Sequence, residues 1–233
     1  YDRLVGSEMC IRDSIKSSAD IGLNMCAITL LYKEGYFKQR IDDDGNQTET
    51  YPKFDPYPLL DKLDLTFKLR LRNRDVFIEV YQYNYIGING HELPVYFLDT
   101  DCEENFPDDQ IISLRLYSGD KDHRILQEAI LGFGGMKLLD ALGQESIQKY
   151  HMNEGHCSFL VLDLLEKYQG DEKKVREQCH FTTHTPVPAG HDHFSYSRVE
   201  KLLKGLLPKG LKLPSLVQNG VFHMTELGLY FSN

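Results

Sequence analysis

Tryptophan is absent from this chain of 233 residues, which counts slightly against a dedicated sugar-binding platform, although its 14 tyrosines can serve the same purpose. No apolar run approaches the roughly 20 residues that a membrane-spanning helix needs, and the first residues lack the apolar centre of a signal peptide. The five cysteines are scattered and form no CxxC pair. They favour free thiols in a reducing compartment. We therefore expect a cytoplasmic protein with no membrane partner.

An excess of positive charge is also missing. The chain has 26 Lys and Arg residues against 35 Asp and Glu residues, and its formal net charge is -9. An acidic surface argues against nucleic acid or an anionic membrane as a partner. It is compatible with a neutral, cationic or polyhydroxyl substrate. The length allows one substantial hydrophobic core or two small ones.

The first half of the chain carries the clearest β pattern. Apolar and polar residues alternate in LDLTFKLRLRN and again in DVFIEVYQYNYIG, on both sides of a turn predicted at residues 73–75. A third strand is predicted in GINGHELPVYFLDTD. A short helix over residues 15–22 and a buried strand over residues 24–32 precede them. The segment IDDDGNQTE is predicted to be disordered, with residues 42–44 in a solvated loop, because the spacing does not fit an EF-hand.

Strands and helices alternate in the second half, which predicts an α/β layer architecture. A helix is expected over residues 122–143, and the glycine-rich piece LGFGGMKLL within it favours close helix packing over a phosphate cradle, because no strand precedes it. ESIQKYHM and HFTTHTP are strand-like and enclose two predicted helices. VFHMTELGLYFSN predicts an amphipathic helix that stops without a cap, which indicates a truncated domain. Its apolar face is expected to lie uncovered.

Six of the nine histidines lie in two clusters, YHMNEGHCSF and HFTTHTPVPAGHDH. A metal site is one interpretation, since two imidazoles on one face can bind a cation. However, His180 and His184 lie on a β-favouring stretch, where four residues span about 13 Å, and HEXXH is absent. A histidine-ligated metallohydrolase remains an alternative, and its candidate ligands are His180, His184, His191 and His193.

The second interpretation of these clusters is substrate binding. Asn153, Glu154 and His156 fall at a predicted strand-to-helix junction, and such junctions form the ligand crevice of α/β sheets. Their side chains offer donors and acceptors suited to sugar hydroxyls. His184, followed by Thr185, lies at a similar strand end. The plain structural alternative, that Asn153 caps a helix and the histidines are loop residues, carries about equal weight.

Taken together, the ordered motifs resemble those of the α-glucan phosphorylases, the glycogen and maltodextrin phosphorylase family, and most closely its short bacterial and archaeal branch. The resemblance runs from Ile15 to Asn233 and rests on these segments: IKSSADIG, LLYKEGYFKQRI, GHELPVYFLDTD, LYSGDKDHRILQEAILGFGG, YHMNEGHCSFL, HFTTHTPVPAGHDHF and FHMTELGLYFSN. It implies a two-domain glycosyltransferase of the B-type fold. This chain would be its Rossmann-like N-terminal half, with a β-rich insertion.

The same resemblance implies an activity. The family transfers a terminal α-1,4-linked glucose to inorganic phosphate and gives glucose-1-phosphate with retained configuration. It uses pyridoxal phosphate, whose phosphate group relays a proton and whose lysine would lie outside this chain, so that no residue here is expected to bind it. The expected partners are an α-1,4-glucan or maltodextrin and phosphate, and a homo-oligomer of the full-length parent is possible. No bound metal is expected.

Site roles also follow from the resemblance. His184 is expected to be catalytic and to contact the transferred glucose through its backbone carbonyl and its ring. The carbonyl would steady positive charge that develops at the anomeric carbon. The remaining residues are expected to bind substrate: Asn153, Glu154, His156 and Thr185 near the acceptor glucose, and Tyr117 and Asp120 near the cleft. Arg124, Gln127 and Glu128 match a motif whose role would be mainly structural.

The chain also departs from the family pattern. Residues 1–14 do not match it and are expected to be a non-native leader, so that residues 15–233 would be a partial N-terminal domain without the C-terminal cofactor domain. The isolated chain is therefore expected to be inactive. A non-catalytic glucan-binding module is the second alternative to the phosphorylase interpretation.

Overall fold

A computed structural model describes the chain except for residues 1–6, 36, 117–118, 145 and 209–216. Its main sheet has four strands in the order β1-β6-β5-β4, with β1 parallel to β6 and the other pairs antiparallel. The bounds are β1 Ala27–Leu30, β4 Asp61–Leu71, β5 Arg74–Ile86 and β6 Glu92–Asp99. Helix α1 (Ser7–Asp20) lies beside β5 and β6 and contains residues 7–14 of the predicted leader. The strands and the predicted short helix are confirmed, and the fold is mixed α/β.

The β4–β5 hairpin forms because its sequence alternates and its turn fits. Leu69, Val76 and Ile78 are fully buried on the side of the sheet that faces the core. Arg72 and Asn73 have φ values of 51° and 62°, the left-handed pair that a tight hairpin turn requires. The hairpin is confirmed, and the turn expected at residues 73–75 begins one residue earlier, at Arg72.

A long helical segment covers the buried side of the sheet. It consists of α3 (Lys121–Ala129), the π-helical turn η2 (Ile130–Gly134) and α4 (Gly135–Ala141). A Cβ added to Gly132 would lie 2.8 Å from the backbone nitrogen of Leu160. The prediction of close helix packing is therefore confirmed for Gly132. The ring of Phe133 stacks on that of Phe159 at 5.7 Å between centroids, which continues the core to the next layer.

That next layer is a strand–helix–strand unit. Strand β7 (Tyr150–Asn153) runs parallel to β8 (Cys179–Thr182), as the alternation predicts. The connection contains η3 (Gly155–Cys157), α5 (Leu160–Lys167) and α6 (Glu172–Gln178).

The last segment differs from its prediction. After η4 (Pro188–Gly190), β9 (His193–Ser195) and α7 (Tyr196–Leu203), strand β11 pairs with both β9 and β10 (Val217–Gln218). The expected helix over VFHMTELGLYF is wrong for its first three residues, which form β11 (Val221–His223), and only Met224–Tyr230 form α8. The expectation of an uncovered apolar face is wrong for Phe222, Met224 and Phe231, which are at most 1% exposed, but Leu229 and Tyr230 are 53% and 44% exposed. Strand pairing and contact with η3 bury the first three.

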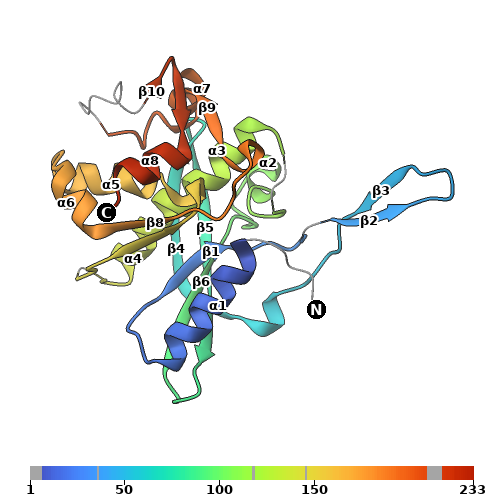
Figure 1. Ribbon diagram of the computed structural model, residues 1–233, viewed down its shortest axis with the longest axis horizontal. Helices are drawn as coiled ribbons and strands as arrows, with labels where there is room; N and C mark the ends of the chain where they lie inside the picture. Colours follow the sequence, from blue (N-terminus) through green and yellow to red (C-terminus); the bar gives the residue numbers. More distant parts are fainter. Residues whose placement is uncertain (1–6, 36, 117–118, 145, 209–216) are drawn as a thin grey trace.

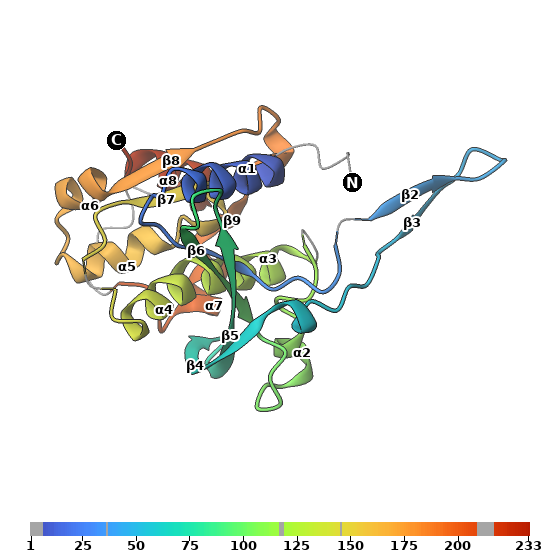
Figure 2. The same cartoon turned by 90° about the horizontal axis from the view of Figure 1, so that it is seen from below.

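A two-stranded ribbon projects from the body in Figures 1 and 2. It consists of β2 (Lys38–Ile41) and β3 (Gln47–Thr50), every residue of which is exposed. The predicted disorder of this segment is therefore wrong, although Asp42–Asp44 do form a solvated turn. The Asp42 carboxylate accepts hydrogen bonds from the backbone N–H groups of Asp44 and Asn46 at 3.0 and 2.8 Å. These local hydrogen bonds order the turn, although the strands on either side of it bury no side chain.

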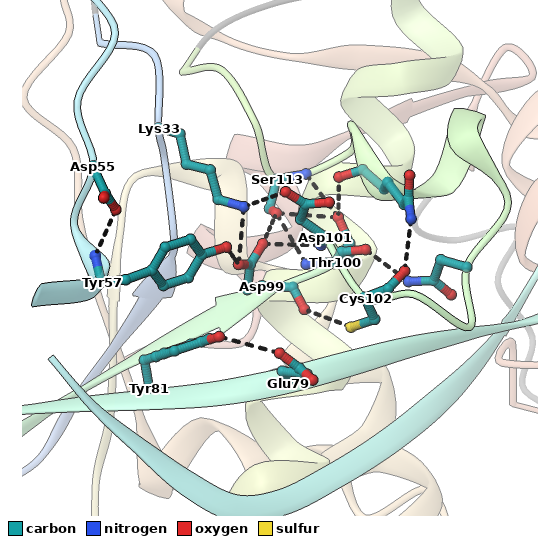
Figure 3. A network of polar contacts seen from close by, with 12 residues as sticks. Lys33, Asp55, Tyr57, Glu79, Tyr81, Asp99, Thr100, Asp101, Cys102 and Ser113 are labelled. Carbon is teal, nitrogen blue, oxygen red and sulfur yellow. Dashed lines mark hydrogen bonds and ion pairs between the residues drawn. The ribbon is translucent and has the colours of Figure 1, made fainter.

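A buried polar cluster fixes both ends of the segment that carries this ribbon (Figure 3). Asp99, the last residue of β6, is 1% exposed and accepts hydrogen bonds from Tyr57 Oη at 2.7 Å and Ser113 Oγ at 2.9 Å. Lys33 Nζ lies 3.3 Å from Asp99 Oδ2 and 2.5 Å from Asp101 Oδ2. Lys33 precedes the ribbon and Tyr57, in η1 (Tyr57–Leu59), follows it. Burial and the bond to Asp99 raise the pKa of Tyr57, so the hydroxyl stays a donor.

The remaining short helix is α2 (Pro107–Gln110), after β6. Within the described residues, no helix combines the length and apolar character needed to span a membrane.

Candidate functional site

The two histidine-rich motifs meet where the parallel strands β7 and β8 end. Asn153 pairs with Thr182 at the last position of the ladder, so the residues that follow both strands emerge at one edge. Ligands of α/β proteins bind at such carboxyl ends of strands. Asn153, Glu154, His184 and Thr185, four of the expected site residues, lie together at this edge.

Glu154 is the centre of this edge, and it is only 2% exposed. Its Oε1 accepts hydrogen bonds from His184 N at 2.5 Å, Thr185 N at 3.0 Å and Thr185 Oγ1 at 3.1 Å. Its Oε2 accepts one from Thr183 Oγ1 at 3.2 Å. Four donors of the 183–185 loop are thus held by one carboxylate. Hydrogen bonds to a charged acceptor contribute about 1.5–3 kcal/mol each, so Glu154 sets the position of this loop.

The backbone of Glu154 has an unusual conformation for a residue with a side chain. Its φ of 64° and ψ of 176° lie in a region that is almost restricted to glycine. Such a residue costs about 1–3 kcal/mol and persists only where its surroundings fix it. The four hydrogen bonds and the bond from Glu154 N to Thr182 O at 2.8 Å provide that constraint. Strain of this kind is concentrated at functional sites.

His184 lies on the surface of the same loop. Its ring is exposed, and Asn153 Nδ2 lies 3.3 Å from its Nε2. Within the described part of the chain, Asn153 Oδ1 is buried and has no hydrogen-bond partner. An acceptor without a partner beside an exposed imidazole suits a ligand that brings hydroxyl groups.

His156 lies in η3, two residues after Glu154, and belongs to a second group of polar side chains. Its Nδ1 lies 3.3 Å from Arg124 Nη2, 3.7 Å from Asp192 Oδ2 and 4.0 Å from Glu128 Oε1. Arg124 Nη2 also contacts Asp192 Oδ2 at 2.5 Å and Glu128 Oε1 at 3.3 Å. Arg124 and Glu128 come from α3, and Asp192 from the loop before β9. The guanidinium thus joins three segments.

Burial raises the pKa of Glu128, and the negative charge of Asp192 raises it further, although Arg124 opposes both effects. Burial also acts to raise the pKa of Asp192, but the side chains of His156 and Arg124 outweigh it, and the pKa falls below its usual range. Asp192 is therefore the carboxylate that these contacts favour as the ionised partner of Arg124, whereas burial favours the protonated form of Glu128.

A metal ion fits this second group poorly. Glu128, His156 and Asp192 are the one set of three possible ligands in close reach of one another within the described residues. Arg124 Nη2 lies within 3.3 Å of all three, so a cation is already in place. The four histidines of the metallohydrolase alternative form no such set in the described chain.

Those other histidines make contacts that tie loops together. His191 Nδ1 lies 2.9 Å from Thr225 Oγ1, and the rings of His193 and His223 stack at 5.9 Å. His180 Nδ1 lies 3.3 Å from the Asn233 carbonyl oxygen. His180, His191 and His193 thus connect neighbouring segments of the chain through these contacts.

Of the two residues expected near the cleft, Tyr117 lies outside the described residues. Asp120 is exposed and caps α3, where its Oδ1 accepts a hydrogen bond from His123 N at 3.0 Å. This bond lowers the pKa of Asp120. Its carboxylate is thus engaged by the helix end.

Two residues of the site have no counterpart in the sequence prediction. Thr183 donates to Glu154, and Asp192 holds Arg124. A weak signal existed for Asp192, since a carboxylate stands between two histidines in HDH. Nothing in the spacing marks its contact with Arg124, which lies 68 positions earlier.

No protein-family model matches the chain. Similar sequences are found among curated proteins. The maltodextrin phosphorylase of Thermococcus litoralis is 38% identical over 238 residues, which cover 95% of this chain and 28% of that protein. The glycogen phosphorylase of Mycobacterium tuberculosis is 34% identical over 253 residues, covering 93% of the chain and 28% of the relative. The glycogen phosphorylase of Aquifex aeolicus is 35% identical over 204 residues, which cover 81% of this chain and 28% of that protein. The chain therefore spans about 28% of the length of these relatives.

Proposed function

Since this chain is homologous to the glycogen and maltodextrin phosphorylases along more than nine tenths of its length, 95% and 93% in two comparisons, we propose that it forms the glucose-binding part of an α-glucan phosphorylase. The complete enzyme would transfer a terminal α-1,4-linked glucose to inorganic phosphate and release glucose-1-phosphate. The mixed α/β region would then be a portion of the Rossmann-like N-terminal half of a B-type glycosyltransferase.

The observation that carries this proposal is the Glu154-held loop. His184 is exposed on it, while the N–H of His184 is fixed by the Glu154 carboxylate at 2.5 Å. Fixing this peptide group also fixes the direction of the neighbouring carbonyl groups. The His184 carbonyl would face the transferred glucose and stabilise positive charge at its anomeric carbon. Prearranged dipoles of this kind are among the largest contributions to catalysis.

The other proposed contacts use hydrogen bonds to sugar hydroxyls. Asn153 offers its buried Oδ1, and His156 offers its ring from the Arg124 cluster. In this proposal Glu154 and Thr185 act on the sugar by holding the loop, because their polar atoms bond to each other at 3.1 Å. Asp120 would act indirectly, by capping the start of α3.

Pyridoxal phosphate, which the family uses, does not fit the described residues. Every described lysine except Lys33 is exposed, and Lys33 is paired with Asp99 and Asp101. A Schiff-base lysine needs an unpaired amine in a desolvated pocket. No step is therefore assigned to the cofactor in this chain, and we expect the chain alone to give no glucose-1-phosphate from maltodextrin, phosphate and pyridoxal phosphate.

Titration calorimetry with a maltooligosaccharide tests the proposal on the chain itself. His184→Ala should raise Kd at least about fivefold, the loss of one hydrogen bond of about 1 kcal/mol. His193→Ala is the matched control, since it removes an exposed imidazole from the same region, and it should leave Kd within about twofold. Equal losses in both variants, or no binding by the wild-type chain, would contradict a glucose site at His184.

A further inference from the structure

Four large apolar side chains are exposed where the end of α1 meets the turn between β5 and β6. They are Ile21 (76% exposed), Leu23 (47%), Ile86 (62%) and Ile88 (90%). In Figure 1 this turn and the end of α1 lie next to each other at the lower end of the molecule, where β6 begins. Single apolar residues on a surface are ordinary, whereas a group of them points to an interaction site.

Hydrogen bonds join the two segments that carry these side chains. The Asp20 carboxylate accepts a hydrogen bond from Ile88 N at 2.9 Å, and the Asp20 carbonyl accepts one from Asn89 Nδ2 at 3.0 Å. His91 Nε2 lies 3.0 Å from the Leu23 carbonyl oxygen. The four apolar side chains therefore belong to one surface, hereafter the apolar patch.

The backbone beneath the apolar patch is closely packed. A Cβ added to Gly87 would lie 2.4 Å from the Ala19 carbonyl oxygen, so the turn packs directly on the last turn of α1. Gly22 and Gly90 have φ values of 70° and 80°, the left-handed conformation that ends the helix and closes the turn. The exposed side chains are thus carried by ordered backbone, and a partner that covers them has little backbone to immobilise.

The sequence around the apolar patch is uncharged. Residues 21–32 and 80–90 contain no Lys, Arg, Asp or Glu, although 26% of the chain is charged and its net charge is -9. Two copies of a chain with this net charge repel each other. An uncharged apolar surface is a place where they can meet without bringing like charges into contact.

We propose that the apolar patch is a self-complementary contact between two copies of this chain. In a twofold contact the same surface faces itself, so the isoleucines of one copy would cover those of the other. A strongly charged partner would find no charge to pair with here, which favours a second copy. The contact is smaller than a standard interface of about 1,600 Å², so the dimer should be weak, with a Kd of about 0.01–1 mM. This inference does not depend on the proposed sugar-binding function.

Sedimentation equilibrium across this concentration range tests the proposal. The share of dimer should increase with protein concentration. The dimer Kd should fall when the NaCl concentration is raised from about 0.05 to about 0.5 M, because salt screens the repulsion between the two net charges. A Kd that rises with salt would indicate an ion-pair contact and would overturn the proposal. A chain that stays monomeric throughout would overturn it too, and would leave a different protein surface as the occupant of the patch.

Two substitutions remove apolar surface without changing the charge. Ile21→Asn and Ile88→Asn alter side chains that are at least 76% exposed, so the fold should not need them. Each should raise the dimer Kd at least about fivefold. Ile41→Asn is the matched control, because Ile41 is 68% exposed on β2 of the ribbon, and it should leave the Kd within about twofold. A dimer that Ile88→Asn leaves intact uses another surface, which would contradict the proposal.

Amide NMR of the ¹⁵N-labelled chain locates the contact directly. On dilution across the same concentration range, the signals of residues 21–24 and 86–91 should shift, while those of the β2–β3 ribbon should stay in place. Shifts confined to other parts of the chain would refute a contact at the apolar patch.

Discussion

Replacing Glu154 by alanine and by glycine measures how much strain the site holds. Both variants lose the carboxylate that accepts four hydrogen bonds from residues 183–185. Alanine must still adopt the φ of 64° and ψ of 176° found at this position, whereas glycine adopts them without steric cost. The strain destabilises the alanine variant by about 1–3 kcal/mol. The greater freedom of glycine in the unfolded chain destabilises the glycine variant by about 0.5–1 kcal/mol.

Glu154→Gly should therefore be more stable than Glu154→Ala by about 0.5–2 kcal/mol. Both should be less stable than the wild-type chain by several kcal/mol, since each lost hydrogen bond to the buried carboxylate contributes about 1.5–3 kcal/mol. Urea unfolding followed by far-ultraviolet circular dichroism and by tyrosine fluorescence gives these differences, provided that the two transitions coincide.

The exposed face of helix α7 offers a matched control. At Glu200, which is helical and exposed, glycine should be less stable than alanine by about 1 kcal/mol. The reasoning therefore predicts opposite signs at the two positions. If glycine is also the less stable variant at residue 154, the backbone of Glu154 is not strained and its conformation needs no constraint from the loop.

Three further outcomes follow from other parts of the structure. Burial raises the pKa of Asp163 to about 6, above its usual value of about 3.9, so folding favours the protonated acid and the cost of ionising it grows between these two values. Asp163→Asn should stabilise the chain above pH 6 by about 1–2 kcal/mol after solvent screening and should have no effect below pH 4; urea midpoints across this range check the sign. Gly132→Ala should destabilise by about 1–3 kcal/mol, because the new Cβ would lie 2.8 Å from Leu160 N, whereas Gly135→Ala, with no atom nearer than 3.8 Å, should be neutral or stabilising in thermal melts. Zinc at micromolar concentration should not bind stoichiometrically, because Arg124 already lies among Glu128, His156 and Asp192; one zinc per chain by elemental analysis after desalting would revive the metallohydrolase alternative.

Much of the fold is predictable where side-chain burial imposes a period on the sequence. The β4–β5 hairpin alternates because one of its faces packs on the core, with Leu69 and Ile78 fully buried. The helix over 121–141 carries an apolar stripe for the same reason. The β2–β3 ribbon could not be predicted this way, because all eight of its strand residues are exposed and no face has an apolar pattern. The three residues of β11 are too short to separate a strand from the start of a helix by periodicity.

At the candidate site, too, some contacts could be predicted from the sequence and others could not. Asn153 and His184 each follow a predicted strand, and parallel strands bring their carboxyl ends together, so their 3.3 Å contact follows from the strand–helix–strand order. Which groups Glu154 would bond, and which group would face His156, depend on loop conformations and on contacts between distant segments. A positive φ at a glutamate has no signature in the sequence, because the residue type disfavours it.

The exposed ribbon has a consequence for how the chain opens. Since neither face of β2 or β3 is buried, shifting one strand past the other by a residue changes no hydrophobic contact. Its register is therefore set by polar contacts: the Asp42 turn, whose carboxylate accepts from Asp44 and Asn46, and the exposed cross-strand bond from Gln39 to Gln47. The ribbon can separate and re-form while the Asp99 cluster keeps its two ends in place. It is thus a local folding unit whose opening free energy is independent of that of the sheet from which it projects.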